Sequence, residues 1–116
     1  MKIFAAVLQL KPQGSVSDNL RHADSLLCEA AEAGAQLAVL PENFAYYGQS
    51  DLLAAGRAES DYKGLVRQFL AQQAKKHSLW LVGGTIPVAE AKPLPFARCY
   101  AVNPQAEAVG HYDKSH

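Results

Sequence analysis

Short apolar runs alternate along the chain with stretches in which apolar residues recur every three or four positions. The runs are typical of strands buried on both faces, and the spaced stretches are typical of helices packed on a sheet. Proline, glycine and serine separate them and indicate where elements begin or end. The strands are predicted over residues 2–10, 36–40, 79–86, 96–102 and 108–112, and the helices over 15–33 and 61–77.

The element order is β-α-β-α-β-β-β, which predicts an α/β fold with a mixed sheet and helices on at least one face. Ser15 or Ser17 can cap the first helix, and Gly34 supplies its C-terminal stop. Residues 44–60 are predicted to be a loop with a short helix from Asp51. The pair Gly83-Gly84, inside the third strand, allows another segment to approach the backbone closely.

The predicted sheet has more apolar surface than two helices can cover. Strands that are apolar at nearly every position are expected to be buried on both faces, and two helices cover only one. We therefore expect a second layer, which either another copy of the chain or sequence outside these residues would supply.

Composition indicates a folded domain and argues against nucleic-acid binding. The chain has 116 residues, and 49% of them are apolar, so it is predicted to be one folded domain, or part of one, over residues 1–116. Its formal net charge is zero and its basic residues are scattered, which argues against a nucleic-acid partner. Lys75-Lys76 is the only basic pair, and it is typical of a helix C-terminus.

The two cysteines, Cys28 and Cys99, have no metal-ligand spacing, and no secretory signal precedes them. A reduced, cytoplasmic setting is therefore expected, without a structural disulfide. No apolar run is long enough to span a membrane, so no membrane partner is expected. Cys28 is interpreted as a small hydrophobe buried in the first helix. Cys99 is a weak candidate nucleophile, because the adjacent Arg98 could lower its pKa.

Glu42 and Lys114 are the strongest candidates for chemistry, because each follows a strand that is predicted to be buried. In open α/β sheets, ligands bind at the carboxyl ends of strands. There a glutamate and a lysine can meet in a pocket, where burial and mutual attraction tune a general base and a cationic oxyanion stabiliser. On position alone, a capping carboxylate and a surface lysine remain alternatives.

Other residue patterns support weaker interpretations. His111, Asp113 and His116 have the form H-x-D-x-x-H, but no second ligand cluster accompanies them, so solvated polar side chains are preferred to a metal site. Gly83-Gly84 lacks the context of a phosphate-binding loop, which favours close packing over a small-ligand module. Tyr46-Tyr47 is consistent either with pocket-lining or with exposed aromatic side chains.

Taken together, these segments resemble the nitrilase superfamily, the carbon–nitrogen hydrolases. The resemblance rests on the glutamate motif Leu40-Pro41-Glu42-Asn43-Phe44, the glycine-containing strand around Gly83-Gly84, and the strand pair ending in Tyr112-Asp113-Lys114-Ser115-His116. Gln9 in the opening strand and Asn19 near the start of the first helix also match. Residues 41–44 and the short connection at 90–95 look closer to the amidase branch, which includes omega-amidases and the amidases that repair deaminated glutathione.

The resemblance implies a Cys-Glu-Lys site with no cofactor and no metal. Glu42 would be the general base, Lys114 the oxyanion stabiliser, and a small linear amide the substrate. The family's cysteine motif is absent from the chain, since neither Cys28 nor Cys99 matches it. The resemblance therefore implies the N-terminal half of a four-layer α-β-β-α sandwich, inactive alone. The alternative is a non-catalytic relic or a binding subunit. Either version would form a homo-oligomer or associate through its exposed sheet.

Overall fold

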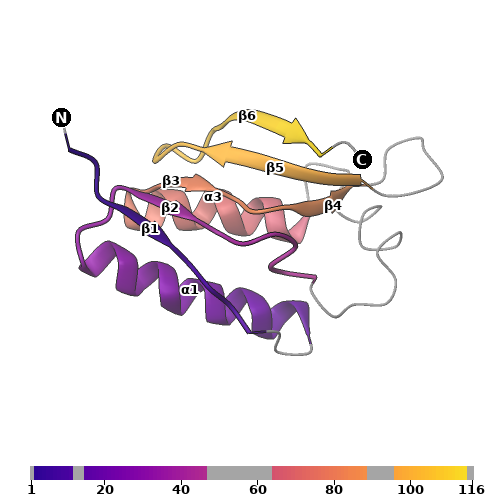
Figure 1. Ribbon diagram of the computed structural model, residues 1–116, viewed down its shortest axis with the longest axis horizontal. Coiled ribbons are helices and arrows are strands. Elements are labelled where there is room, and N and C mark those ends of the chain that lie inside the picture. Colours follow the sequence, from indigo (N-terminus) through magenta and orange to yellow (C-terminus); the bar gives the residue numbers. More distant parts are fainter. Residues whose placement is uncertain (1, 12–14, 47–63, 89–95, 115–116) are drawn as a thin grey trace.

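The computed structural model describes residues 2–11, 15–46, 64–88 and 96–114 (Figure 1). These residues form a mixed sheet with helices on one side, as the sequence pattern predicts. The short helix expected from Asp51 and the first residues of the helix expected from residue 61 lie outside the described ranges.

The sheet has a parallel part and an antiparallel part. β1 pairs with β2 and β2 with β3, both in parallel, and β3 pairs with β5 in antiparallel register. β5 also pairs in antiparallel register with β4 and with β6. The strands are β1 (Ala5–Val7), β2 (Leu37–Val39), β3 (Trp80–Val82), β4 (Ile86–Val88), β5 (Phe96–Val102) and β6 (Ala108–Asp113).

The strand expected over residues 79–86 is two strands, because the backbone leaves the regular ladder around Gly83-Gly84. β3 and β4 both pair with β5. Gly84 has φ of 63°, and a Cβ there would lie 2.1 Å from the carbonyl oxygen of Pro41. A Cβ on Gly83 would lie 2.6 Å from a methyl carbon of Leu70. The predicted close approach is thus confirmed, and the approaching segment is the one that contains Glu42.

The first helix, α1 (Val16–Glu32), begins and ends at the predicted residues. The Ser15 hydroxyl accepts a hydrogen bond from the backbone N–H of Asp18 at 3.1 Å, which caps the helix. Gly34, with φ of 94°, follows its C-terminus. The second described helix, α3 (Leu65–His77), starts after Gly64 and ends at Ser78 in the left-handed conformation.

The hydrophobic core lies between these two helices and one face of the sheet. α1 contributes Leu27 and α3 contributes Leu70, while Leu81 lies at the centre of the sheet. All three side chains are essentially inaccessible to solvent. This core fixes the position of β2, the strand that leads to Glu42.

The opposite face of the sheet is open within the described residues. Val7, on β1, is 77% exposed, and Trp80, on β3, is 48% exposed. The parallel register puts both on the same face, away from the residues packed against the helices. The expectation that the strand over residues 2–10 is buried on both faces is therefore wrong. β1 is a short edge strand, and its side chains are largely exposed.

The close approach at Gly84 predicts a steep cost for any side chain there. We expect Gly84→Ala to lower the free energy of unfolding by at least about 2 kcal/mol, because a left-handed non-glycine residue is strained and its Cβ would displace Pro41. The matched control is Gly110→Ala on β6, where a Cβ meets open space and the change is expected to stay within about 0.5 kcal/mol. Urea unfolding of the variants checks this, and equal midpoints would contradict it.

Candidate active site

The structure brings Glu42 and Lys114 together, although 72 positions separate them in the chain. The Lys114 Nζ donates a hydrogen bond to the Glu42 Oε1 at 2.7 Å. The sheet topology accounts for the meeting. β6 is antiparallel to β5, which is antiparallel to β3, so β6 runs in the same direction as β2 and β3. The carboxyl ends of β2 and β6 therefore lie toward the same edge of the sheet.

The Glu42 segment is held on both sides of the glutamate. Before it, Pro41 packs against Gly84. After it, Asn43 adopts φ of 53°, and its backbone N–H donates to the Thr85 Oγ1 at 2.7 Å. Asparagine tolerates the left-handed region better than most residues. The turn that presents Glu42 is therefore fixed by backbone contacts rather than by the glutamate side chain.

A buried amide supports the same turn from the first helix. Asn19, in α1, is almost completely buried, and its Nδ2 donates to the backbone carbonyl of Ala45 at 2.8 Å. Phe44 and Tyr46, on either side of Ala45, are buried in the core. A signal for this role is visible in the sequence, because Asn19 lies among the apolar positions of the first helix.

The Lys114 end is anchored to β5. The Lys114 backbone N–H donates to the carbonyl of Ala97 at 2.9 Å. One residue earlier, Asp113 accepts two hydrogen bonds from Arg98, at 2.6 Å from Nε and 3.1 Å from Nη2. Sequence reasoning assigned Arg98 to Cys99 and missed this pair. The missed signal was the register of the hairpin, which places the two opposite charges directly across from each other.

The Glu42–Lys114 pair is open to solvent within the described part of the chain. The Glu42 side chain is 61% exposed and that of Lys114 is 50% exposed. The expectation that the pair is buried is therefore not met within these residues. Water screens the attraction between exposed charges. The Glu42 carboxylate and the Lys114 ammonium are in contact and open on one side. Both can therefore still reach a third group, such as a nucleophile.

Neither cysteine has the activated thiol that such a group needs. Cys28 is only partly buried, and its Sγ lies 3.6 Å from the Glu32 carboxylate. Desolvation and the Glu32 charge raise the pKa of the Cys28 thiol. Burial raises the pKa of Cys99, against the opposite effect of the Gly83 backbone. The expectation that Arg98 would lower the pKa of Cys99 is wrong, because Arg98 pairs with Asp113.

The weaker candidates have structural explanations. Gly83-Gly84 has no room for a phosphate, since the Pro41 carbonyl and the Leu70 side chain occupy the space above it. Tyr46 is buried in the core, and Tyr47 lies outside the described residues, as does His116. The described ranges contain no group of three histidine, cysteine or acidic side chains arranged to hold a metal ion.

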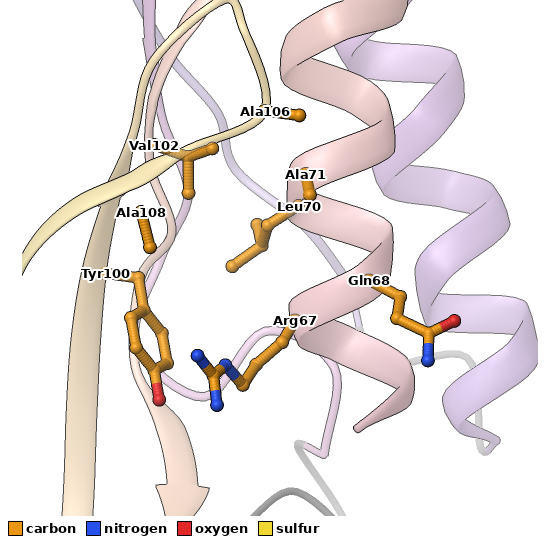
Figure 2. A pocket seen from close by; sticks show the side chains of 8 residues that line it. All are labelled: Arg67, Gln68, Leu70, Ala71, Tyr100, Val102, Ala106 and Ala108. Atoms are coloured by element: carbon orange, nitrogen blue, oxygen red, sulfur yellow. The ribbon is translucent and has the colours of Figure 1, made fainter. Parts of the chain in front are cut away.

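A separate cavity of about 270 Å³ lies between α3 and the β5–β6 hairpin. Figure 2 shows the guanidinium of Arg67 beside the ring of Tyr100, with alanine, valine and leucine side chains above them. The Arg67 guanidinium carbon lies 4.8 Å from the centroid of the ring. Neither Glu42 nor Lys114 lines this cavity, so it is distinct from the candidate active site.

Comparison with known proteins identifies the family of this chain. The sequence model of the family described as carbon-nitrogen hydrolase matches residues 4–116. The chain belongs to the carbon–nitrogen hydrolase family. Among curated relatives, omega-amidase NIT2 of Mus musculus is 35% identical over 115 residues, which are 96% of this chain and 39% of that protein. Deaminated glutathione amidase of Synechocystis sp. is 28% identical, over 97% of this chain and 42% of that protein.

Solved structures of this hydrolase family share the fold. Saccharomyces cerevisiae Nit3, a member of branch 10 of the nitrilase superfamily, matches with a TM-score of 0.82 and 26% identity, over 98% of this chain and 44% of that chain. A variant of the amidase from Nesterenkonia sp. AN1 matches with a TM-score of 0.79 and 25% identity, over 98% and 43%. That structure shows covalent addition of the acetamide moiety of fluoroacetamide at the active site cysteine.

This member of the family spans about two fifths of the length of the curated relatives it matches, and the match is to their N-terminal part. The nitrilase-type fold and the superfamily expected from the sequence are confirmed. In the described residues, no helix is both long enough and apolar enough to cross a bilayer.

The raised pKa values of the two thiols predict slow alkylation. A higher pKa means a smaller thiolate fraction at neutral pH, so iodoacetamide should react more slowly with folded Cys28 and Cys99 than with the same thiols in urea-unfolded chain. The variants Cys28→Ser and Cys99→Ser separate the two rates, and mass spectrometry follows them. A folded-state rate at pH 7 above the unfolded rate would contradict the assignment.

Proposed function

We propose that Glu42 and Lys114 are two members of the Cys-Glu-Lys site of an amidase that acts on a small linear amide, with the cysteine supplied by sequence outside these 116 residues. The observation that carries the proposal is the 2.7 Å contact between Lys114 and Glu42, at the ends of two strands running in the same direction. Family membership and the omega-amidase and deaminated glutathione amidase relatives support the reaction class.

Each group has a role that its chemistry allows. The Glu42 carboxylate accepts the cysteine proton, and the resulting thiolate attacks the amide carbon. The carbonyl oxygen becomes an oxyanion, which the Lys114 ammonium stabilises. The fold holds this ammonium in place beforehand, so it does not have to reorganise during the reaction. The tetrahedral intermediate then breaks its carbon–nitrogen bond. The nitrogen takes the proton from Glu42 and departs as ammonia, and a thioester remains on the cysteine. Water, deprotonated by Glu42, then attacks the thioester and releases the acid and the thiol.

The nucleophile is the part that residues 1–116 do not provide. Cys28 and Cys99 both have raised pKa values, and neither lies in the family's cysteine motif. Removal of a covalent nucleophile typically lowers turnover by several orders of magnitude. We therefore propose that residues 1–116 alone have no significant amidase activity. We further propose that the working enzyme is cytoplasmic, forms a homo-oligomer or associates through its exposed sheet, and takes no nucleic acid or membrane as partner.

The decisive experiment uses the natural gene product that contains these residues. We expect it to hydrolyse small linear amides, and Glu42→Gln to lower kcat/KM by about a thousandfold or more while leaving the melting temperature unchanged, because glutamine cannot take the cysteine proton. Ammonia release measures the rate. The matched control is Glu29→Gln, an exposed glutamate on α1, which should retain activity.

Near-normal kcat/KM in the Glu42→Gln variant would overturn the assignment of the base. No ammonia release from the natural gene product with any linear amide would overturn the proposed function itself.

The second candidate is non-catalytic: a truncated relic, or a subunit that binds a full-length relative. The open sheet face, with Val7 and Trp80 exposed, favours this reading, because contiguous apolar surface of this kind marks association sites.

Solution mass separates the two versions of the second candidate. A binding subunit predicts a defined oligomer of residues 1–116 with cooperative unfolding, and a relic predicts an ill-defined aggregate. Sedimentation at several concentrations, followed by thermal unfolding, measures both properties. A monodisperse monomer that unfolds cooperatively would contradict both versions.

A further inference from the structure

The ion pair between Arg98 and Asp113 joins β5 to β6 one residue before Lys114. The two side chains face each other directly across the ladder and make the two-bond, fork-to-carboxylate contact that fixes both distance and orientation. Only 13% of the Arg98 side chain is exposed, against 41% of that of Asp113. The arginine is therefore the fixed partner, and the aspartate is the partner that it holds.

The end of β6 needs such support. Every residue of β6 is exposed, so the strand has no packed face to position it. The contact between Lys114 and Glu42 is itself half exposed, and ion pairs of that kind contribute little to holding a backbone in place. The lysine therefore depends on the backbone that precedes it, which is tied to β5 by the Ala97 carbonyl and by Arg98.

Arg98 is itself held on a rigid support. The Asp113 carboxylate, and then the Tyr100 hydroxyl, raise the pKa of the Arg98 guanidinium, so it stays charged at every relevant pH. Tyr100 is buried, and the Arg67 guanidinium from α3 lies over its ring (Figure 2). The contacts thus run from α3 through Tyr100 to Arg98 and on to the residue before Lys114.

We propose that Arg98 is a positioning residue that, through its two-bond contact with Asp113, places the Lys114 ammonium against the Glu42 carboxylate. The inference rests on the proposed function, because that function is what assigns Lys114 a catalytic role. The contact itself is a property of residues 1–116 and can be measured without any activity.

Zero-length cross-linking of residues 1–116 with a water-soluble carbodiimide measures that contact. The reagent activates the Glu42 carboxylate, and the Lys114 amine displaces the urea, so an amide forms with the net loss of one water. The Lys76–Asp24 pair, at 3.4 Å between α1 and α3, is an internal reference in the same molecule. Its cross-link reports that the helical layer is folded.

We expect Arg98→Gln to lower the ratio of the Lys114–Glu42 cross-link to the Lys76–Asp24 cross-link several-fold, and Asp113→Asn to do the same. The charge-swapped double variant Arg98→Asp, Asp113→Arg should restore much of the ratio, because the ion pair is re-formed across the same ladder. The matched control is Arg21→Gln, which removes another arginine paired with an aspartate and should leave the Lys114–Glu42 yield unchanged.

An unchanged ratio in both Arg98→Gln and Asp113→Asn would overturn the proposal. If Arg98→Gln fails to fold, the reference cross-link is lost, and Asp113→Asn then decides the question. In the natural gene product, Arg98→Gln should lower kcat about tenfold with little change in KM, since Lys114 is misplaced but substrate binding is not. An inactive parent enzyme would refute the proposed function, while the cross-link ratio would still decide the role of Arg98.

Discussion

The contact between the backbone of Gly84 and the carbonyl of Pro41 joins the two halves of the described structure. It lies where the chain passes from β3 to β4, both of which pair with β5. It also fixes the turn that begins at Pro41, because Thr85, the next residue, accepts a hydrogen bond from Asn43. One backbone approach that only glycine permits therefore shapes the sheet and presents Glu42 at its edge.

The open face of the sheet occurs in a chain that matches about two fifths of the length of its curated relatives. Two helices cover one face, and the relatives of this chain are more than twice as long. Trp80 and Val7 on the uncovered face are apolar, and apolar positions on both sides of a strand are typical of sheets that are covered on both faces. Glu42 and Lys114, at the edge of the same sheet, are half exposed as well.

The electrostatics of the site follow from that exposure. An exposed carboxylate–ammonium pair is weak as a structural element, so its geometry depends on supports with better burial. Asn19 supplies one for the glutamate turn, and Arg98 supplies one for the end of β6. Both are polar side chains in mostly buried positions, where each hydrogen bond has strict geometry and a missing partner is costly. Glu42 and Lys114 can stay accessible because the side chains that support their backbones are mostly buried.

The sequence by itself determined the features that depend on neighbouring residues. Ser15 and Gly34 mark the ends of α1, and apolar spacing gives the order of strands and helices. Local propensity and capping act within a few residues, so a single sequence is enough to read them. The motif around Glu42 and the strand pair that ends at Lys114 indicated the family because both resemble its motifs.

Only the tertiary structure decided which distant groups meet. Gly83-Gly84 signalled a close approach but not that Pro41 makes it, and Arg98 was assigned to its chain neighbour Cys99 rather than to Asp113. Such pairings depend on strand register and on which face of the sheet is covered. A shift of one residue in strand register would move every side chain of that strand to the other face of the sheet. Packing between segments far apart in the chain sets this register.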